Sequence, residues 1–157
     1  MDLILWRHAE AEDLPEGNPQ GRSDLDRALT PRGEKQAVRM ASWLDRQLPE
    51  GTRILVSPAT RCEQTALALG RKYKIRKELA PDGTSAQLLE VVQWPLSKSP
   101  ILVVGHQPIL GQIISQLLGL RESDFPIKKG SIWWLRSRDK DGQSQTVVMT
   151  VQSPEIL

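Results

Sequence analysis

The sequence predicts an α/β fold of three layers: a mostly parallel central sheet, helices on both of its faces, and an antiparallel hairpin at one edge. Apolar runs at residues 2–6, 53–56 and 100–104 alternate with segments of helical periodicity, which is typical of a parallel sheet. Apart from Asp2 and Arg53 at their starts, these runs are continuously apolar, as strands covered on both faces are. Two more strand-like runs, 131–136 and 145–151, flank a polar turn with one glycine, which predicts the hairpin.

Length and composition predict one domain spanning residues 1–157. Lysine and arginine number 21 against 19 acidic residues, and this net charge of +2 is too small to indicate nucleic-acid binding. The single cysteine, Cys62, cannot form an internal disulfide, which suits a reducing compartment. We find no signal peptide and no run long enough to span a bilayer. We therefore expect a cytoplasmic protein that binds neither membrane nor nucleic acid.

The first strand is followed by a polar stretch, residues 9–29, rich in proline and glycine. We predict a loop of functional length there. Thr30 and Pro31 then form a hydroxyl N-cap and a proline at the first helical position. Apolar residues recur along this helix at helical spacing. They are Ala37, Ala41, Leu44 and Leu48.

The middle of the chain predicts two more helices and a short strand. Ser57 and Pro58 repeat the cap-plus-proline start and predict a helix that runs to about Lys72, which places Arg61 in its first turn. Residues 74–77 predict a charged, solvated edge strand, and a turn containing Asp82 leads to a helix over 85–93.

Polar residues follow three of the predicted strands. Arg7 and His8 follow the first strand, Arg61 opens the helix after the second, and His106 ends the run 100–104 and leads into a helix closed by Gly119. Because parallel strands end at the same edge of a sheet, we expect these side chains to meet.

Two arginines and two histidines near helix N-termini predict a phosphate site, because the guanidinium fork matches pairs of phosphate oxygens. A neutral imidazole can also accept a phosphoryl group covalently. We assign the role of phosphoryl acceptor to His8, because neighbouring positive charge helps to keep its imidazole neutral. His106 would stabilise the equatorial oxygens of the transferring group.

Four sequence blocks in this order resemble the histidine phosphatase superfamily. They are RHAEA at 7–11, LTPRG at 29–33, VSPATRCEQTA at 56–66 and VGHQP at 104–108. Their spacing extends over residues 2 to about 120, and the compact length is similar to that of the short bacterial branch, the SixA-type phosphohistidine phosphatases. The resemblance implies a phosphoglycerate mutase-like fold.

The resemblance also implies roles for individual residues. His8 would be phosphorylated transiently, Arg7 and Arg61 would hold the phosphoryl oxygens, and His106 would complete the pocket, with no metal or other cofactor. Arg27 falls where the short branch often has a further pocket arginine. Ala9 replaces the usual glycine, which could narrow the approach of the backbone to the phosphate.

The general acid of the predicted site has the least support from the sequence. Asp82 is the nearest candidate, with Glu10 and Glu12 as alternatives on the loop, where such residues are also typical of simple solvation. An alkoxide needs protonation to leave, whereas imidazole can leave neutral, its conjugate acid having a pKa of about 6.5. The lack of a convincing general acid therefore favours phosphohistidine on a protein as the substrate. A histidine phosphotransfer domain is one candidate for that protein.

The sequence is compatible with two alternative functions. A small-molecule phosphomonoesterase or mutase-like phosphotransferase would depend strongly on an acid such as Asp82. A non-catalytic phosphate-binding module would keep the arginines without needing a nucleophile, and the pairing of His8 with His106 argues against it.

Overall fold

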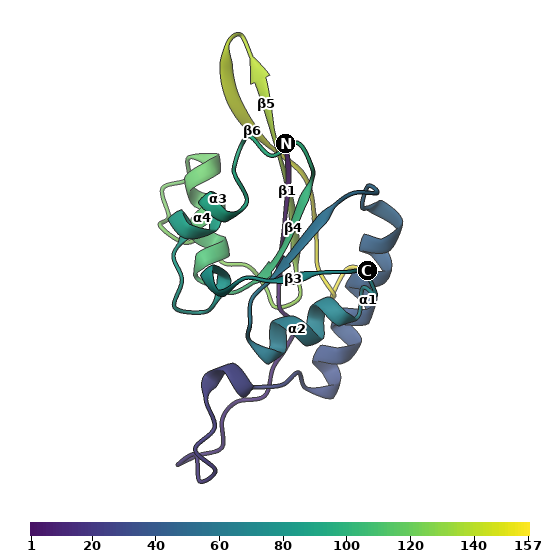
Figure 1. Ribbon diagram of the computed structural model, residues 1–157, viewed down its shortest axis with the longest axis vertical. Helices are drawn as coiled ribbons and strands as arrows, with labels where there is room; N and C mark the ends of the chain where they lie inside the picture. Colours follow the sequence, from purple (N-terminus) through teal and green to yellow (C-terminus); the bar gives the residue numbers. More distant parts are fainter.

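The computed structural model describes residues 1–157 and is built on one sheet of six strands in the order β3-β2-β4-β1-β5-β6 (Figure 1). The first four strands of that order run parallel, and β5 and β6 are antiparallel neighbours at one edge. The predicted mostly parallel sheet with an edge hairpin is confirmed. The strands are β1 Asp2–Arg7, β2 Arg53–Val56, β3 Lys74–Ile75, β4 Ile101–Gly105, β5 Ile132–Lys140 and β6 Gln143–Gln152.

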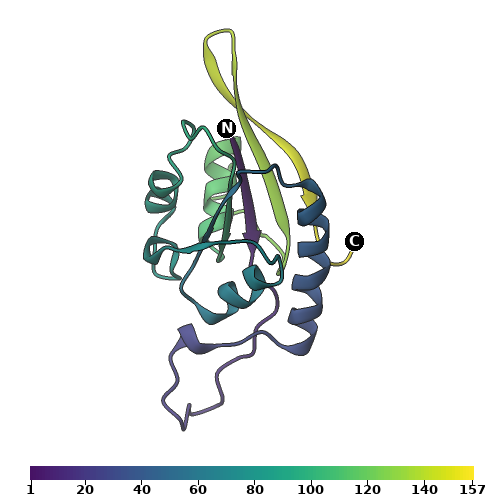
Figure 2. The same cartoon turned by 45° about the vertical axis from the view of Figure 1, so that its right-hand side comes forward.

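Helices cover both faces of the sheet, as Figure 2 shows. They are α1 Pro31–Gln47, α2 Thr60–Leu67, α3 Ser85–Val91 and α4 Ile109–Leu118, with short 3-10 helices η1 Asp24–Asp26 and η2 Lys77–Leu79. Successive strand residues point to opposite faces. Accordingly, Ile4 and Trp6 of β1 pack with α1 and α2, while Leu3 and Leu5 pack with α3 and α4. None of the helices is long and apolar enough to cross a membrane.

The register of the parallel strands brings their carboxyl ends to one level. Arg7 lies opposite Gly105, and Val56 lies opposite Val104. The chain leaves the sheet immediately afterwards, so His8, Ser57 and His106 all project from the same edge, as expected for a ligand site of an open α/β sheet.

The start of α1 and the end of α4 follow their sequence signals. The Thr30 hydroxyl accepts a hydrogen bond of 2.9 Å from the Gly33 amide and Pro31 takes the first helical position. Gly119 closes α4 with a φ of 66°, a conformation that glycine adopts at no steric cost.

The prediction for α2 was wrong at both ends. The helix begins at Thr60 and ends at Leu67, and its N-cap Ala59 makes no side-chain capping bond. Ser57 lies two residues before this N-cap, and its hydroxyl accepts a 3.2 Å hydrogen bond from the Ala59 amide and lies 2.7 Å from Nε2 of His106. Arg61 nevertheless lies in the first turn, as predicted.

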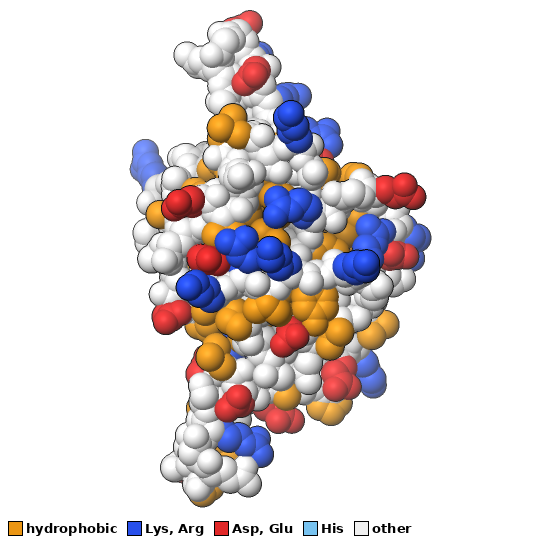
Figure 3. Space-filling view, in the orientation of Figure 1, with side chains coloured by type: hydrophobic (Ala, Val, Ile, Leu, Met, Phe, Trp, Pro, Cys, Tyr) orange, Lys and Arg blue, Asp and Glu red, His pale blue; other side chains and the backbone are white.

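The edge strand β3 is exposed, as its charge pattern predicted. Both residues of β3 are exposed, and Figure 3 shows Lys and Arg side chains gathered in the middle of that face, where β3 lies in Figure 1. At the other edge the strands of the hairpin are longer than predicted, and Asp141 and Gly142 between them both have positive φ, as a two-residue type I′ turn requires.

Candidate active site

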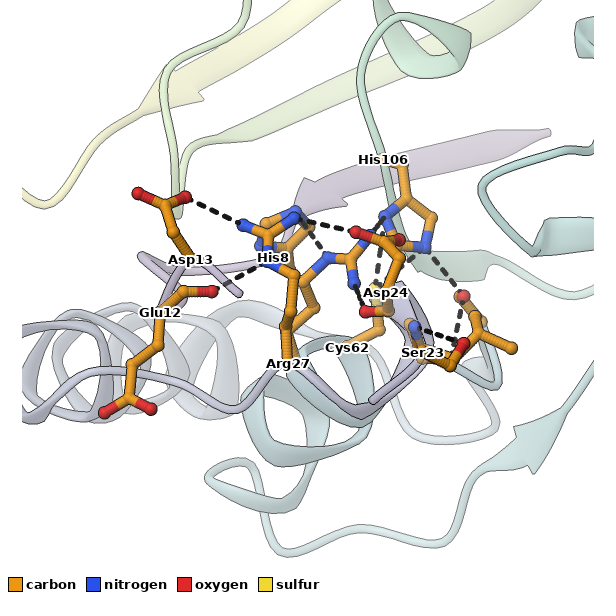
Figure 4. A network of polar contacts seen from close by, with 12 residues as sticks. His8, Glu12, Asp13, Ser23, Asp24, Arg27, Cys62 and His106 are labelled. Atoms are coloured by element: carbon orange, nitrogen blue, oxygen red, sulfur yellow. Dashed lines mark hydrogen bonds and ion pairs between the residues drawn. The ribbon is translucent and has the colours of Figure 1, made fainter. Parts of the chain in front are cut away.

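Two histidines and an arginine from three sequence-distant segments lie in contact at the carboxyl edge of the sheet. The rings of His8 and His106 are 5.3 Å apart between centroids, at 60°. Nε of Arg61 lies 3.3 Å from Nε2 of His8, and an Nη of the same guanidinium lies 3.4 Å from Nδ1 of His106. All three residues are buried. The structure therefore brings these predicted residues together, as Figure 4 shows for the two rings.

The ring of His8 is oriented by its own backbone. Nδ1 lies 2.7 Å from the carbonyl oxygen of Ala9, and because a carbonyl only accepts, we assign the ring proton to Nδ1. Nε2 is then unprotonated, and its lone pair accepts the hydrogen bond from Nε of Arg61. Burial, followed by the charges of Arg61 and Arg7, lowers the pKa of His8 to about 4 despite the bond to Ala9. The imidazole is therefore neutral at pH 7, the form that can attack phosphorus.

The ring of His106 has a different partner. Its Nε2 lies 2.7 Å from the hydroxyl of Ser57, and burial, followed by the charges of His8 and Arg61, lowers its pKa to about 3. A serine hydroxyl can either donate or accept, so Ser57 can support whichever tautomer of His106 the site requires. The Cys62 sulfur is 3.4 Å from the same nitrogen, and burial raises the pKa of this thiol to about 12. Cys62 is therefore an uncharged neighbour of the ring.

Arg7 supplies positive charge next to both histidines. Its charge contributes to lowering the pKa of His8 and that of His106. One Nη donates to the carbonyl of Ile127, while the buried Nε has no hydrogen-bond partner. An unpaired buried donor costs free energy unless it finds an acceptor, so Arg7 is suited to an anion in this site.

Arg27 joins the site through an acidic residue that the sequence analysis missed. Its Nε donates to the carbonyl of Glu12 over 2.7 Å, and an Nη donates to Asp24 Oδ1 over 3.0 Å. Asp24 Oδ2 in turn accepts from Arg61 over 3.0 Å, and its backbone carbonyl accepts from the same guanidinium over 2.8 Å. Figure 4 shows Asp24 placed between Arg27 and His106.

Comparisons with known proteins agree with this arrangement. A family described as the histidine phosphatase superfamily (branch 1) matches residues 3–82. The chain is 32% identical to a phosphohistidine phosphatase SixA homolog of Haemophilus influenzae, covering 99% of this chain and 98% of the relative. The chain belongs to the histidine phosphatase superfamily.

Further relatives place it in the SixA-type branch of that superfamily. Phosphohistidine phosphatase SixA of Escherichia coli is 30% identical, over 74% of each chain. A solved putative SixA from Nakamurella multipartitia superimposes with a TM-score of 0.78 at 27% identity, covering 98% of this chain and 95% of that one. A SixA complexed with tungstate has a TM-score of 0.74 at 27% identity, covering 99% of both chains.

Ala9, another predicted site residue of this histidine phosphatase, is held by the neighbouring backbone and side chains. The amide of Ala9 donates to the hydroxyl of Thr65 over 3.1 Å, and its carbonyl holds His8. Ala9 therefore orients the ring of His8, while a direct contact with phosphate stays a prediction. The contacts of Ser57 and Asp24 with the site were not predicted. A Ser-Pro pair such as Ser57-Pro58 is also typical of a helix start, and Asp24 lies in a polar loop whose sequence has no periodicity.

The structure does not bring the proposed acids to the histidines. The carboxylate of Glu10 accepts a 2.7 Å hydrogen bond from the Thr30 hydroxyl at the start of α1. Asp82 lies in the turn before α3, and no hydrogen bond or ion pair joins its side chain to His8 or His106. Figure 4 shows the carboxylate of Glu12 turned away from both rings.

The low pKa of His8 predicts acid sensitivity of the fold. The value falls from 6.5 to about 4 on folding, so the unfolded chain binds more protons between these values and stability is lost as pH falls through this window. We expect wild type to lose about 2 kcal/mol more unfolding free energy than His8→Gln between about pH 7.5 and pH 5. Urea unfolding of both proteins at both pH values measures this difference. Equal losses would show that His8 is not buried in its neutral form.

Proposed function

We propose that this histidine phosphatase hydrolyses phosphohistidine on a protein, through a covalent phosphohistidine intermediate on His8. The observation that supports it most is the bond from Nδ1 of His8 to the Ala9 carbonyl, at 2.7 Å. It leaves Nε2 as the unprotonated nitrogen, which accepts a hydrogen bond of 3.3 Å from Nε of Arg61 in the resting site and is available to phosphorus once that bond is released. The solved SixA relative that binds tungstate, an oxyanion, supports an anion site in this branch.

In the first step, Nε2 of His8 attacks phosphorus and the P–N bond of the substrate breaks. The bonding pair returns to the substrate ring, which leaves as neutral imidazole when its other nitrogen carries a proton. Arg7 and Arg61, with Arg27 beside them, neutralise the phosphoryl oxygens, and His106 donates to one of them when Nδ1 is protonated. Such positioned charge is the main source of catalysis in phosphoryl transfer.

In the second step, water attacks phosphorus and the P–N bond to His8 breaks. The phosphorylated ring still carries the Nδ1 proton that the Ala9 carbonyl holds. It therefore leaves as neutral imidazole, and Nε2 regains its lone pair. The proton of the water goes to the phosphate product or to solvent, so neither step requires a carboxylic acid.

The carboxylates favour this substrate class over alkyl phosphate esters. Glu10 is held by Thr30, and Asp24 is the carboxylate bound to the site arginines. Burial alone raises the pKa of Asp24, but hydrogen bonds from Arg27 and Arg61 hold it below its ordinary value. Asp24 is therefore ionised at pH 7 and has no proton to give to an alkoxide.

The substrate class can be tested with a panel of phosphorylated compounds. We expect kcat/KM for a phosphohistidine protein, such as a phosphorylated histidine phosphotransfer domain, to exceed that for sugar and nucleotide phosphates by about 10²-fold or more. Asp82→Asn and Glu10→Gln should change the phosphohistidine rate by no more than about threefold. A sugar or nucleotide phosphate as best substrate, with a large loss in Asp82→Asn, would instead identify a phosphomonoesterase. Saturable phosphate binding without any hydrolysis would identify a binding module.

A further inference from the structure

Asp24 occupies the hydrogen-bond donors that a phosphoryl group on His8 would need. Arg61 gives one Nη to the Asp24 carboxylate at 3.0 Å and the other to its backbone carbonyl at 2.8 Å. Arg27 gives an Nη to the second carboxylate oxygen at 3.0 Å. One carboxylate thus bridges two guanidinium groups, in the way that a phosphoryl group with several oxygens would.

The same residue covers the buried part of the site. His8 is 7% exposed, Arg61 4% and His106 3%, whereas the side chain of Asp24 is 49% exposed. Asp24 therefore lies between solvent and the buried groups.

The segment that carries Asp24 has little apolar packing to lose. Its 3-10 helix, Asp24–Asp26, contains no buried residue and is held by a capping box with Ser23. Asp24 is ionised, so it and an incoming phosphoryl group would repel each other at the same donors. Only one of the two anions can use Arg27 and Arg61 fully at one time.

We propose that the Asp24 carboxylate stands in for the phosphoryl oxygens in the resting enzyme and is exchanged for them when substrate binds. The proposal rests on the function proposed above, because it assumes that Arg27 and Arg61 hold the phosphoryl group. Asp24 keeps the buried guanidinium of Arg61 paired between turnovers. On return it competes with the product phosphate and promotes its release, so Asp24 sets the affinity of the site for phosphate.

The test uses inorganic phosphate, which binds without turnover. Calorimetric titration of Asp24→Asn should give a Kd for phosphate about tenfold lower than wild type, because a like charge has been removed from the site. Phosphate should also inhibit turnover at a correspondingly lower concentration. Asp13→Asn is the matched control, since Asp13 lies 3.8 Å from Arg27 but is fully exposed, and its Kd should stay within about twofold of wild type.

Thermal melting provides an independent readout. Without phosphate, Asp24→Asn should melt below wild type because Arg61 loses its partner, and saturating phosphate should raise its Tm more than that of wild type. An unchanged or weaker phosphate affinity in Asp24→Asn would overturn the exchange while leaving the phosphatase proposal intact. Absence of phosphate binding in wild type and both variants would overturn the exchange and the anion site together.

Discussion

The His8→Ala variant is expected to lose at least about 10⁴-fold in kcat/KM for a phosphohistidine protein, because removal of a covalent nucleophile leaves only binding and electrostatic assistance. The loss should appear in kcat, since the arginines proposed to bind the phosphoryl group are unchanged. Steady-state kinetics with kcat and KM determined separately measure it.

Two controls make the result specific to the nucleophile. His8→Ala should still bind inorganic phosphate, which demonstrates a folded site. Glu12→Gln, on the same loop with its carboxylate turned away from the rings (Figure 4), should retain activity within about twofold. A His8→Ala enzyme that keeps activity within tenfold of wild type would exclude the proposed mechanism.

The second large effect is expected at Arg61, which contacts both histidines and Asp24. Arg61→Ala should lower kcat by about 10³-fold, because the guanidinium neutralises charge on the transferring phosphoryl group. Arg61→Lys should recover no more than about tenfold of that loss, since an ammonium cannot reproduce the planar fork. The measurement is kcat for the three proteins with the same phosphohistidine substrate.

Arg71 offers a matched control for Arg61. It also pairs with an aspartate, Asp45 at 3.2 Å, but that ion pair is on the surface. Arg71→Ala should therefore change kcat by less than about twofold, and circular dichroism and melting of each variant verify the fold. Full activity in Arg61→Lys would show that one positive charge suffices and that the bidentate geometry is not used.

The strands and helices that position the site could be predicted because their signals are local. Thr30 followed by Pro31 is a strong helix start, and a continuously apolar run such as 101–104 is typical of a central strand. Since parallel strands share one carboxyl edge, the juxtaposition of His8, Arg61 and His106 could be expected from the parallel arrangement of the strands.

The finer parts of the site depend on contacts between segments that no local pattern encodes. Ser57 has the same Ser-Pro signature whether its hydroxyl caps a helix or binds a buried imidazole, and here it contacts His106. Asp24 belongs to a polar loop without periodicity, so nothing in the sequence separated it from its acidic neighbours. Its importance appears only when Arg61 from α2 reaches it.

The proposed covalent intermediate on His8 is tested most directly by trapping it. The enzyme is mixed briefly with a protein carrying radiolabelled phosphohistidine, quenched in alkali, and the labelled enzyme peptide is identified. We predict an alkali-stable, acid-labile label on His8 of wild type that is absent from His8→Ala. Turnover without any such label, or an alkali-labile label on a carboxylate such as Asp24, would contradict the mechanism.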